Sequence, residues 1–382
     1  MVSFKRNFSM KKQQIITVGR DFDTIYLGIK EFAPQEIHLL VTKESRPLCA
    51  PLISLVGEKL EIREYLVGPY DVEGISRVCD KILAENEGDE FVFNLSEGTK
   101  IMALSAGKVA REHGCRAIYI TQDGYWIDTI DYVRKPLKSS ISNEDYLRLY
   151  GGSVREFEDV ASLKSLDVNA AYYVKKFIER YYDIYRMAKS WFRRLELPKI
   201  GDYYFKGRLP NGCEIETQGG TLSIYRGFEV FFDSACRRCC ELMFLGRWWE
   251  VVVADVVADW HREQDKKGAI WHDVIFNEQS GNAVKNEVDL LVNDRQRLLL
   301  IECKSGEVLS SDVFKIDSVR RTYAGNNSKA LLVSYLPLPL SIKEKCRDLG
   351  IYYFAPEYMS ERSKHIEKLP QWLDNIVKMH EL

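Results

Sequence analysis

Three charged residues stand in two segments that otherwise have the pattern of buried β-strands. Asp289 lies in NEVDLLVN (286–293), and Glu302 and Lys304 lie in RLLLIECK (297–304). Burying one carboxylate is costly, and burying two close together costs more unless a cation or a proton lies between them. The pattern therefore predicts a chemical site in this part of the chain.

The types and spacing of these residues suit phosphodiester hydrolysis. Glu302 and Lys304 are two positions apart on one strand, so their side chains lie on one face, and Asp289 on the neighbouring antiparallel strand can face them. Two carboxylates and the backbone carbonyl of Cys303 are hard oxygen ligands of the kind that Mg²⁺ or Mn²⁺ prefers. Lys304 can orient or help to deprotonate a water, or balance the charge of a phosphate. The alternative is a cross-strand salt bridge, for which the flanking apolar runs are a poor setting.

The same residues resemble the PD-(D/E)xK nuclease superfamily, whose motif is an acid, a variable gap and [DE]-x-K, with a further acid on a preceding helix. Asp289 matches the first acid, with VD in place of PD, and ECK matches the second element. Glu250 fits the helix position, and Glu287 either binds a second metal or flanks the site. The resemblance implies catalytic residues Glu250, Asp289, Glu302 and Lys304, and metal ligands Asp289, Glu302, Cys303 and Glu250.

The first 135 residues alternate short β-rich runs with amphipathic segments. This alternation predicts a parallel sheet covered by helices on both faces, with ligands beyond the carboxyl ends of the strands. Two loops stand at such ends: GRDFDT (19–24) and NLSEGTK (94–100), the second leading into a helix. Its hydroxyls, amide, lysine and free backbone N–H groups suit a phosphate or a ribose, although an ordinary helix cap is the alternative. We expect strands at 14–19, 36–42, 60–67, 91–95 and 115–120, and an edge strand at 126–131.

The second loop resembles a known signature. NLSEGTKIM is similar to the N-x-[ST]-x-G-T-K-x-M motif of CARF domains, Rossmann-like sensors that bind cyclic oligoadenylates, and GRDFDT stands where that family has its other ligand loop. Glu97 replaces a glycine that many relatives have, which adds a negative charge beside the expected phosphate. No GxGxxG or GxxxxGK[ST] motif is present, so a dinucleotide cofactor or NTP hydrolysis is not expected. The resemblance implies ligand-binding residues Gly19, Arg20, Asp21, Thr42, Asn94, Ser96, Glu97, Gly98, Thr99 and Lys100.

The composition and the remaining segments limit the class of protein that is expected. The 382 residues carry a formal net charge of −2, which gives no overall attraction to nucleic acid, and nine cysteines lack paired spacing. We expect a cytoplasmic protein with reduced thiols and no membrane span, because no apolar run approaches about 20 residues. The cluster CRRCC (236–240) permits zinc, but no second ligand pair completes a tetrahedron. Residues 169–196 predict one long Tyr-rich helix that packs against a neighbour or, alternatively, clamps a single strand.

The chain is therefore expected to be an α/β protein with three parts. These are a Rossmann-like CARF sensor (1–140), a linker with a long helix (141–214) and a PD-(D/E)xK, restriction-endonuclease-like domain (215–382). In the third part we expect a helix at 246–260, strands at 270–277, 286–293, 297–304, 329–335 and 351–356, a tight turn at Asp294 and Arg295, and a helix at 311–324.

Together the two resemblances imply an endonuclease of type III CRISPR antiviral defence that a cyclic oligoadenylate activates. They also imply a homodimer across which the ring lies, with cyclic tetra-adenylate favoured because its two-fold symmetry suits an isologous dimer. Mn²⁺ or Mg²⁺ would be the cofactor, and single-stranded DNA or RNA the substrate. Two alternatives stay open: a ring nuclease that degrades the cyclic nucleotide, and a ligand-controlled nucleic-acid-binding regulator without catalysis.

Overall fold

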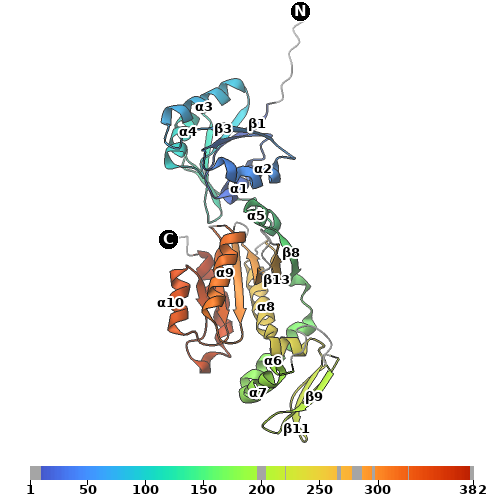
Figure 1. Cartoon of the computed structure of the whole chain (residues 1–382). Coiled ribbons are helices and arrows are strands. Elements are labelled where there is room, and N and C mark those ends of the chain that lie inside the picture. The colour runs from blue at the N-terminus through green and yellow to red at the C-terminus, as the bar shows by residue number, and fades with distance from the viewer. Residues whose placement is uncertain are drawn as a thin grey trace, which may run out of the picture.

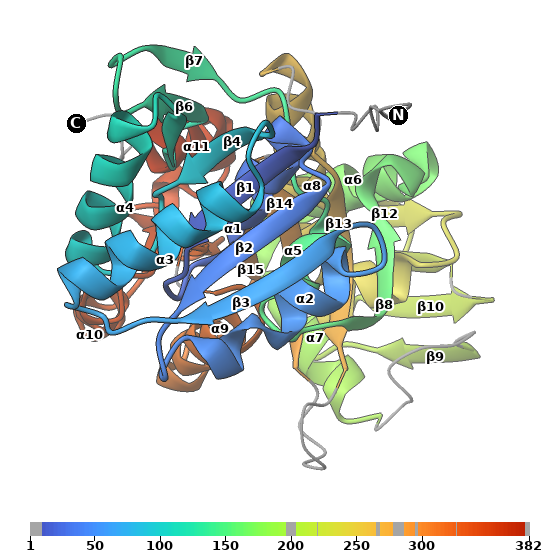
Figure 2. The same cartoon turned by 90° about the horizontal axis from the view of Figure 1, so that it is seen from above.

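The fold places three β-sheets one after another along an elongated molecule (Figure 1). The computed structural model describes residues 10–195, 204–219, 221–264, 268–277, 286–294, 297–325 and 327–378. The N-terminal sheet lies at one end, the six-stranded C-terminal sheet in the middle, and a small antiparallel sheet at the other end. Figure 2 shows the N-terminal sheet in front of the C-terminal one, with the small sheet projecting to one side.

The N-terminal sheet has the predicted parallel core. Its strand order is β3-β2-β1-β4-β5-β6-β7, so the order reverses between β1 and β4, which pair in parallel. The expected edge strand is β6, but the short β7 lies outside it. The strands are β1 (Lys12–Thr17), β2 (Glu36–Val41), β3 (Glu61–Leu66), β4 (Glu90–Asn94), β5 (Arg116–Ile120), β6 (Tyr125–Asp128) and β7 (Arg134–Pro136).

Helices cover both faces of this sheet, as the alternation predicted. The side chains of β1 alternate, so Ile16 packs in one apolar cluster with α1 and α2, while Ile15 packs in another with α3 and α4. The central strands β1 and β2 are thereby buried on both faces. The helices are α1 (Phe22–Phe32), α2 (Ala50–Val56), α3 (Val72–Glu85) and α4 (Lys100–Glu112).

The C-terminal sheet follows the predicted order of elements. Its strand order is β17-β16-β15-β14-β13-β8, where β8 is Val154–Asp159. Strands β13, β14 and β15 are antiparallel, and β15, β16 and β17 are parallel. The turn expected at Asp294 and Arg295 falls partly outside the described residues. The elements are α8 (Arg247–Glu263), β13 (Ile270–Phe276), β14 (Glu287–Asn293), β15 (Leu298–Lys304), α9 (Ser310–Tyr323), β16 (Lys329–Ser334), α10 (Leu340–Asp348), β17 (Tyr352–Phe354) and α11 (Leu369–Lys378).

The segment 141–214, expected to be a linker, takes part in the C-terminal fold. After α5 (Asn143–Leu149), β8 (Val154–Asp159) pairs with β13 and forms an edge of the C-terminal sheet. The long helix expected at 169–196 is instead two helices, α6 (Ser165–Arg180) and α7 (Tyr182–Arg193), because the backbone leaves the helical region at Tyr181, with φ −129° and ψ 48°. The tyrosines of α6 and α7 mostly pack against neighbouring elements. Tyr185 belongs to the core cluster that includes α8, and Tyr172, Tyr181 and Tyr182 pack against this cluster.

A four-stranded antiparallel sheet has no counterpart in the prediction. Its order is β12-β11-β10-β9, and its inward side chains, such as Ile215 and Ile224, join the apolar cluster of α6 and α8. The three cysteines of the CRRCC cluster lie in the same core, as small buried side chains. The strands are β9 (Tyr204–Arg208), β10 (Glu214–Gln218), β11 (Leu222–Arg226) and β12 (Glu229–Ser234).

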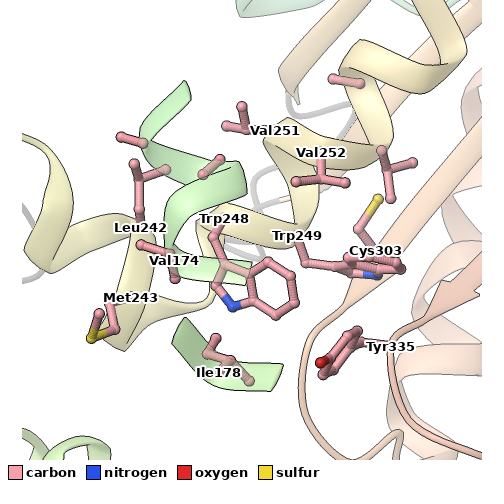
Figure 3. Close-up of a cluster of buried hydrophobic side chains, with 14 of the residues drawn as sticks. Val174, Ile178, Leu242, Met243, Trp248, Trp249, Val251, Val252, Cys303 and Tyr335 are labelled. Carbon is pink, nitrogen blue, oxygen red and sulfur yellow. The ribbon is translucent and has the colours of Figure 1, made fainter. Parts of the chain in front are cut away.

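Two tryptophans fix the start of α8 over the C-terminal sheet (Figure 3). Trp248 and Trp249 are buried against Tyr335 with ring centroids 4.8 and 5.3 Å away, and Trp249 Nε1 donates to the carbonyl of Val333 at 3.1 Å. Gly246 before them has φ 88°, and a Cβ there would come 2.4 Å from Ser305 Oγ. The first turn of α8 is therefore held beside the end of β15, which positions Glu250.

Candidate functional site

The structure brings Asp289, Glu302 and Lys304 together on the sheet, as expected from the strand pattern. Leu290 of β14 pairs with Ile301 of β15 in an antiparallel arrangement. The next pair of facing positions is therefore Asp289 and Glu302. The backbone N–H of Cys303 donates to Asp289 Oδ2 at 2.6 Å, and Lys304 Nζ lies 2.9 Å from Glu302 Oε1. Two carboxylates and one ammonium thus share one face of neighbouring central strands.

Glu302 is the most enclosed acid of this group, at 1% exposure. Its Oε1 meets the ammonium groups of Lys304 and Lys315, the latter at 3.3 Å, whereas Oε2 is buried without a hydrogen-bond partner among the described residues. A buried carboxylate oxygen without a partner is unfavourable, so its retention points to a ligand that is bound there during function. The surface salt-bridge alternative does not fit this enclosure.

Glu250 joins the group from α8, as its helix position predicted. The pKa of Glu250 is raised to about 7, first by burial and then by the nearby carboxylates of Asp273 and Glu302, against the opposing effect of Arg247. Burial also raises the pKa of Asp289, followed by the charges of Glu302 and Glu250. The three acids therefore repel one another in a region of low polarity, and a cation between them would relieve this repulsion.

The donor set fits a hard divalent cation. Glu250, Asp289 and Glu302 offer carboxylate oxygens, which Mg²⁺ and Mn²⁺ prefer, and the free Oε2 of Glu302 is available for one of them. In the described part of the chain, however, no three His, Cys, Asp or Glu side chains are already arranged at metal-binding positions. Metal binding and the role of the Cys303 carbonyl accordingly stay predictions.

Three charged residues that the sequence pattern did not predict also lie at this centre. Lys315 on α9 bridges Glu302 and Glu287, at 3.3 and 3.4 Å. Asp273 on β13 is opposite Asp289, because its neighbours His272 and Val274 pair with Leu290 and Val288.

The backbone of Asp273 has φ 51°, a left-handed conformation that costs about 1–3 kcal/mol in a residue with a side chain. Arg247 Nη1 lies 3.4 Å from Asp273 Oδ2. Arg247 is three positions before Glu250 on α8, so the two side chains share a face of this helix. This spacing is the sequence signal from which Arg247 could have been placed near the acids.

In the sensor, the structure places the two predicted loops side by side at the switch point. A Cβ on Gly19 would come 2.3 Å from Glu97 Oε2 and 2.7 Å from the backbone nitrogen of Gly98, so only glycine fits there. Asp21 is the N-cap of α1, and Thr42 follows β2, the next strand. Lys100 begins α4 with an exposed side chain. The loops thus form one edge on which a phosphate could lie.

Several predicted ligand groups are used within the loop itself. Thr99 Oγ1 accepts from the N–H of Met102, so it is an ordinary helix cap, and it also donates to the carbonyl of Pro69. Ser96 Oγ donates to Asn94 Oδ1 and accepts from the N–H of Ile120, and the side chain of Asn94 is fully buried. These three residues hold the loop in shape and do not direct free groups outward.

Glu97 lies against the N-terminus of α1. Its carboxylate accepts from the N–H of Asp21 at 3.4 Å and from Thr24 Oγ1 at 3.3 Å. The pKa of Glu97 is raised to about 7, first by burial and then by the charges of Asp21 and Asp23. A helix N-terminus is a favourable site for a phosphate oxygen. The carboxylate of Glu97 occupies this site at α1.

The N-terminal part and the C-terminal sheet make direct polar contacts. Asn327, in the loop before β16, donates from Nδ2 to both carboxylate oxygens of Asp23 on α1, at 3.0 and 3.3 Å. Gln122 donates to Asn327 Oδ1 at 2.9 Å, and Tyr150 donates to Asp23 Oδ1 at 3.1 Å. One apolar cluster also runs from α1 and α2 through α5 to β13 and β14.

Comparison with known proteins decides the class of the C-terminal part. Residues 238–372 match the family model of the Card1-like endonuclease domain. This segment contains α8, the sheet from β13 to β17 and all four predicted catalytic residues. Curated proteins gave no match to the chain.

Solved structures share the fold of nearly the whole chain. Can2 from Sulfobacillus thermosulfidooxidans, solved with cyclic tetra-adenylate, superposes with a TM-score of 0.66 at 19% identity over 94% of this chain and 99% of that one. Protein VC1899 from Vibrio cholerae gives a TM-score of 0.67 at 17% identity over 95% and 98%. A type III CRISPR defence DNA nuclease activated by cyclic oligoadenylate gives 0.56 at 18% identity, over 95% of this chain and 52% of that one. These likenesses show that the N-terminal and C-terminal parts of the chain share the overall fold of these structures.

Within the described ranges, no helix has both the length and the apolar character that crossing a bilayer requires.

Proposed function

We propose that this protein is a metal-dependent endonuclease of type III CRISPR defence that a cyclic oligoadenylate, preferably cyclic tetra-adenylate, switches on. The observation that carries the proposal is the group of Glu250, Asp289, Glu302 and Lys304 in a Card1-like endonuclease domain, on a chain whose other end has the sensor fold. Can2 was solved with cyclic tetra-adenylate, and another neighbour is described as a nuclease activated by cyclic oligoadenylate. These relatives support the choice of activator.

At the nuclease centre, Asp289, Glu302 and Glu250 would hold Mn²⁺ or Mg²⁺. When bound, such a cation supplies Lewis-acid polarisation of the phosphoryl group and lowers the pKa of a water. Lys304 is kept protonated near Glu302, because the charge and hydrogen bond of that acid raise its pKa even though burial would lower it. As a cation, Lys304 can orient the attacking water and stabilise charge on the phosphate, but it cannot accept a proton.

The proposed homodimer would complete the ring site, since one set of loops can contact only part of a cyclic ligand. A surface groove of about 480 Å³ on the sensor, lined by side chains of α4 and β5, supports this proposal. Leu104 and Tyr132 beside it are 70% and 78% exposed, which is unusual for large apolar residues that cluster on a monomer. Light scattering should therefore give the mass of two chains.

The test of the function is cleavage of labelled single-stranded DNA and RNA in Mn²⁺, with and without each cyclic oligoadenylate. We expect cleavage to depend on one ring size. Cleavage that is equally fast without any ring would contradict the switch. Consumption of the ring with no cleavage of either strand would favour the ring-nuclease alternative, and strand binding without either reaction would favour the regulator.

The affinity for the ring should fall as the pH rises. The pKa of Glu97 is raised to about 7, so the carboxyl is mostly neutral at pH 6 and mostly charged at pH 8, whereas phosphodiesters stay anionic throughout. If only the neutral form admits a phosphate at the α1 N-terminus, the affinity at pH 8 should be roughly tenfold lower than at pH 6. Calorimetry at both pH values measures this, and Glu97→Gln should remove most of the difference. An equal pH dependence in the variant would show that another group is responsible.

A further inference from the structure

The pocket beside the catalytic acids contains an arginine to which the predicted catalytic motif assigns no role. Arg238, Arg247, Glu250, Asp273 and Asp289 line a small cavity of about 10 Å³ between α8 and the sheet. The cavity has room for about one water and none for a nucleotide. A nucleic-acid strand therefore cannot enter the cavity. It must pass outside, where it contacts the charged side chains at the border of the cavity.

The cations around this centre differ in how firmly they are already engaged. Lys304 contacts Glu302 and Asp312, and Lys315 contacts Glu302 and Glu287. Arg238 is held by Asp167 at 3.2 Å and Glu241 at 3.4 Å. Each of these three cations is therefore already held between two carboxylates of the protein.

Arg247 makes fewer ion pairs than these three cations. Its guanidinium has five N–H donors, and in the described part of the chain its one ion pair is to Asp273, through Nη1 at 3.4 Å. The side chain is 29% exposed and lies in the first turn of α8, on the same face as Glu250. Most of its donors can therefore reach an anion that arrives from solvent.

The approach of a polyanion to this centre needs such a cation. Glu250, Asp273, Asp289 and Glu302 place four carboxyl groups around the point where a phosphate must come close. Each phosphate of a nucleic-acid strand carries a negative charge, and arginine binds phosphate oxygens with planar, bidentate geometry. The other charged groups that line the cavity are Glu250, Asp273, Asp289 and Arg238, and two acids already hold Arg238. Arg247 is therefore the cation that a second phosphate next to the reacting one would meet.

We propose that Arg247 binds the backbone phosphate adjacent to the scissile one, and that Asp273 is a positioning residue that aims the guanidinium. The inference rests on the proposed nuclease function and names a contact with its substrate. The left-handed backbone of Asp273, at φ 51° in the middle of β13, turns its carboxylate toward α8 and Arg247. Backbone strain of this kind is retained where a side chain must be aimed.

The experiment is a binding titration with the full-length Glu302→Gln protein, which should not cleave, in Mn²⁺ and cyclic tetra-adenylate. The probe is a fluorescent single-stranded DNA oligonucleotide, with the matching RNA in parallel, at several KCl concentrations. Adding Arg247→Ala should weaken binding about tenfold, as expected for one charge-assisted contact. The slope of log affinity against log salt should also become shallower by about 0.7, the value for one phosphate contact to a single strand.

Three variants make the result specific. Arg321→Ala removes an exposed cation of α9 that is paired with Asp317, and it should leave the slope unchanged. Arg247→Lys should keep the slope, because the charge remains, while it recovers only part of the affinity. Asp273→Asn should weaken binding less than Arg247→Ala, without changing the slope.

An unchanged slope in Arg247→Ala, with a normal melting temperature, would overturn the inference and leave Arg247 as a structural partner of Asp273. If Arg247→Ala does not fold, Arg247→Gln gives the same comparison. Absence of binding to either strand by the parent protein would instead count against the proposed nuclease function, so the two failures are distinguishable.

Discussion

Replacing Glu302 by glutamine is expected to lower the rate of strand cleavage by roughly 1,000-fold or more, the equivalent of about 4 kcal/mol of transition-state stabilisation. The change removes the charge but keeps the shape of a side chain that is 1% exposed. It takes an anionic oxygen from the proposed cation and leaves Lys304 and Lys315 beside a neutral amide. Single-turnover cleavage at saturating ring and Mn²⁺ measures the effect.

The matched control is Glu307→Gln, which removes an exposed carboxylate shortly after β15. It should retain cleavage. The affinity of Glu302→Gln for the ring should equal that of the parent. The sensor contacts Asn327 just before β16, and Glu302 lies toward the opposite end of the parallel strands β15 and β16. Substantial cleavage by a folded Glu302→Gln protein would contradict the assignment of the catalytic centre, even if the ring still binds.

Replacing Asn327 by alanine is expected to lower the ratio of cleavage rates with and without the ring, by about fivefold or more. Coupling free energies between sites typically amount to 1–3 kcal/mol, roughly 5- to 150-fold. Asn327 joins Asp23 and Gln122 of the sensor to the loop that follows α9. The helix α9 also carries Lys315, which contacts Glu302, so one rigid element reaches from the sensor contact to the catalytic acid.

The ratio is measured at saturating ring, so that a change in ring affinity cannot imitate a loss of coupling. Asn169→Ala, at an exposed position of α6, is the matched control and should keep the full ratio. Coupling must be reciprocal, so bound substrate should tighten ring binding in the parent more than in Asn327→Ala. A normal ratio in the variant would show that the signal takes another route, such as the apolar cluster through α5.

Much of the candidate site follows from local patterns in the sequence. The apolar runs LLV and LLLI predicted the strands that carry Asp289, Glu302 and Lys304. Side chains two positions apart on a strand share a face, which placed Glu302 and Lys304 together. The strand-to-helix turn of NLSEGTK likewise predicted a loop at the switch point of a parallel sheet. The match to the endonuclease domain over residues 238–372 confirms the class of the C-terminal part.

The tertiary structure decided the contacts between distant segments. The strand β8 pairs with β13 although more than 100 residues separate them. The sequence of β8, VREFED, contains no signal that specifies this partner strand. Asp273 reaches Arg247 through a single left-handed residue within an apolar strand pattern, which periodicity cannot reveal. Asp23 and Asn327 are 304 positions apart. Local sequence determined which faces are apolar and which residue types can do chemistry, whereas the packing of those faces determined which charged groups meet, because such pairs depend on the register and orientation of whole elements.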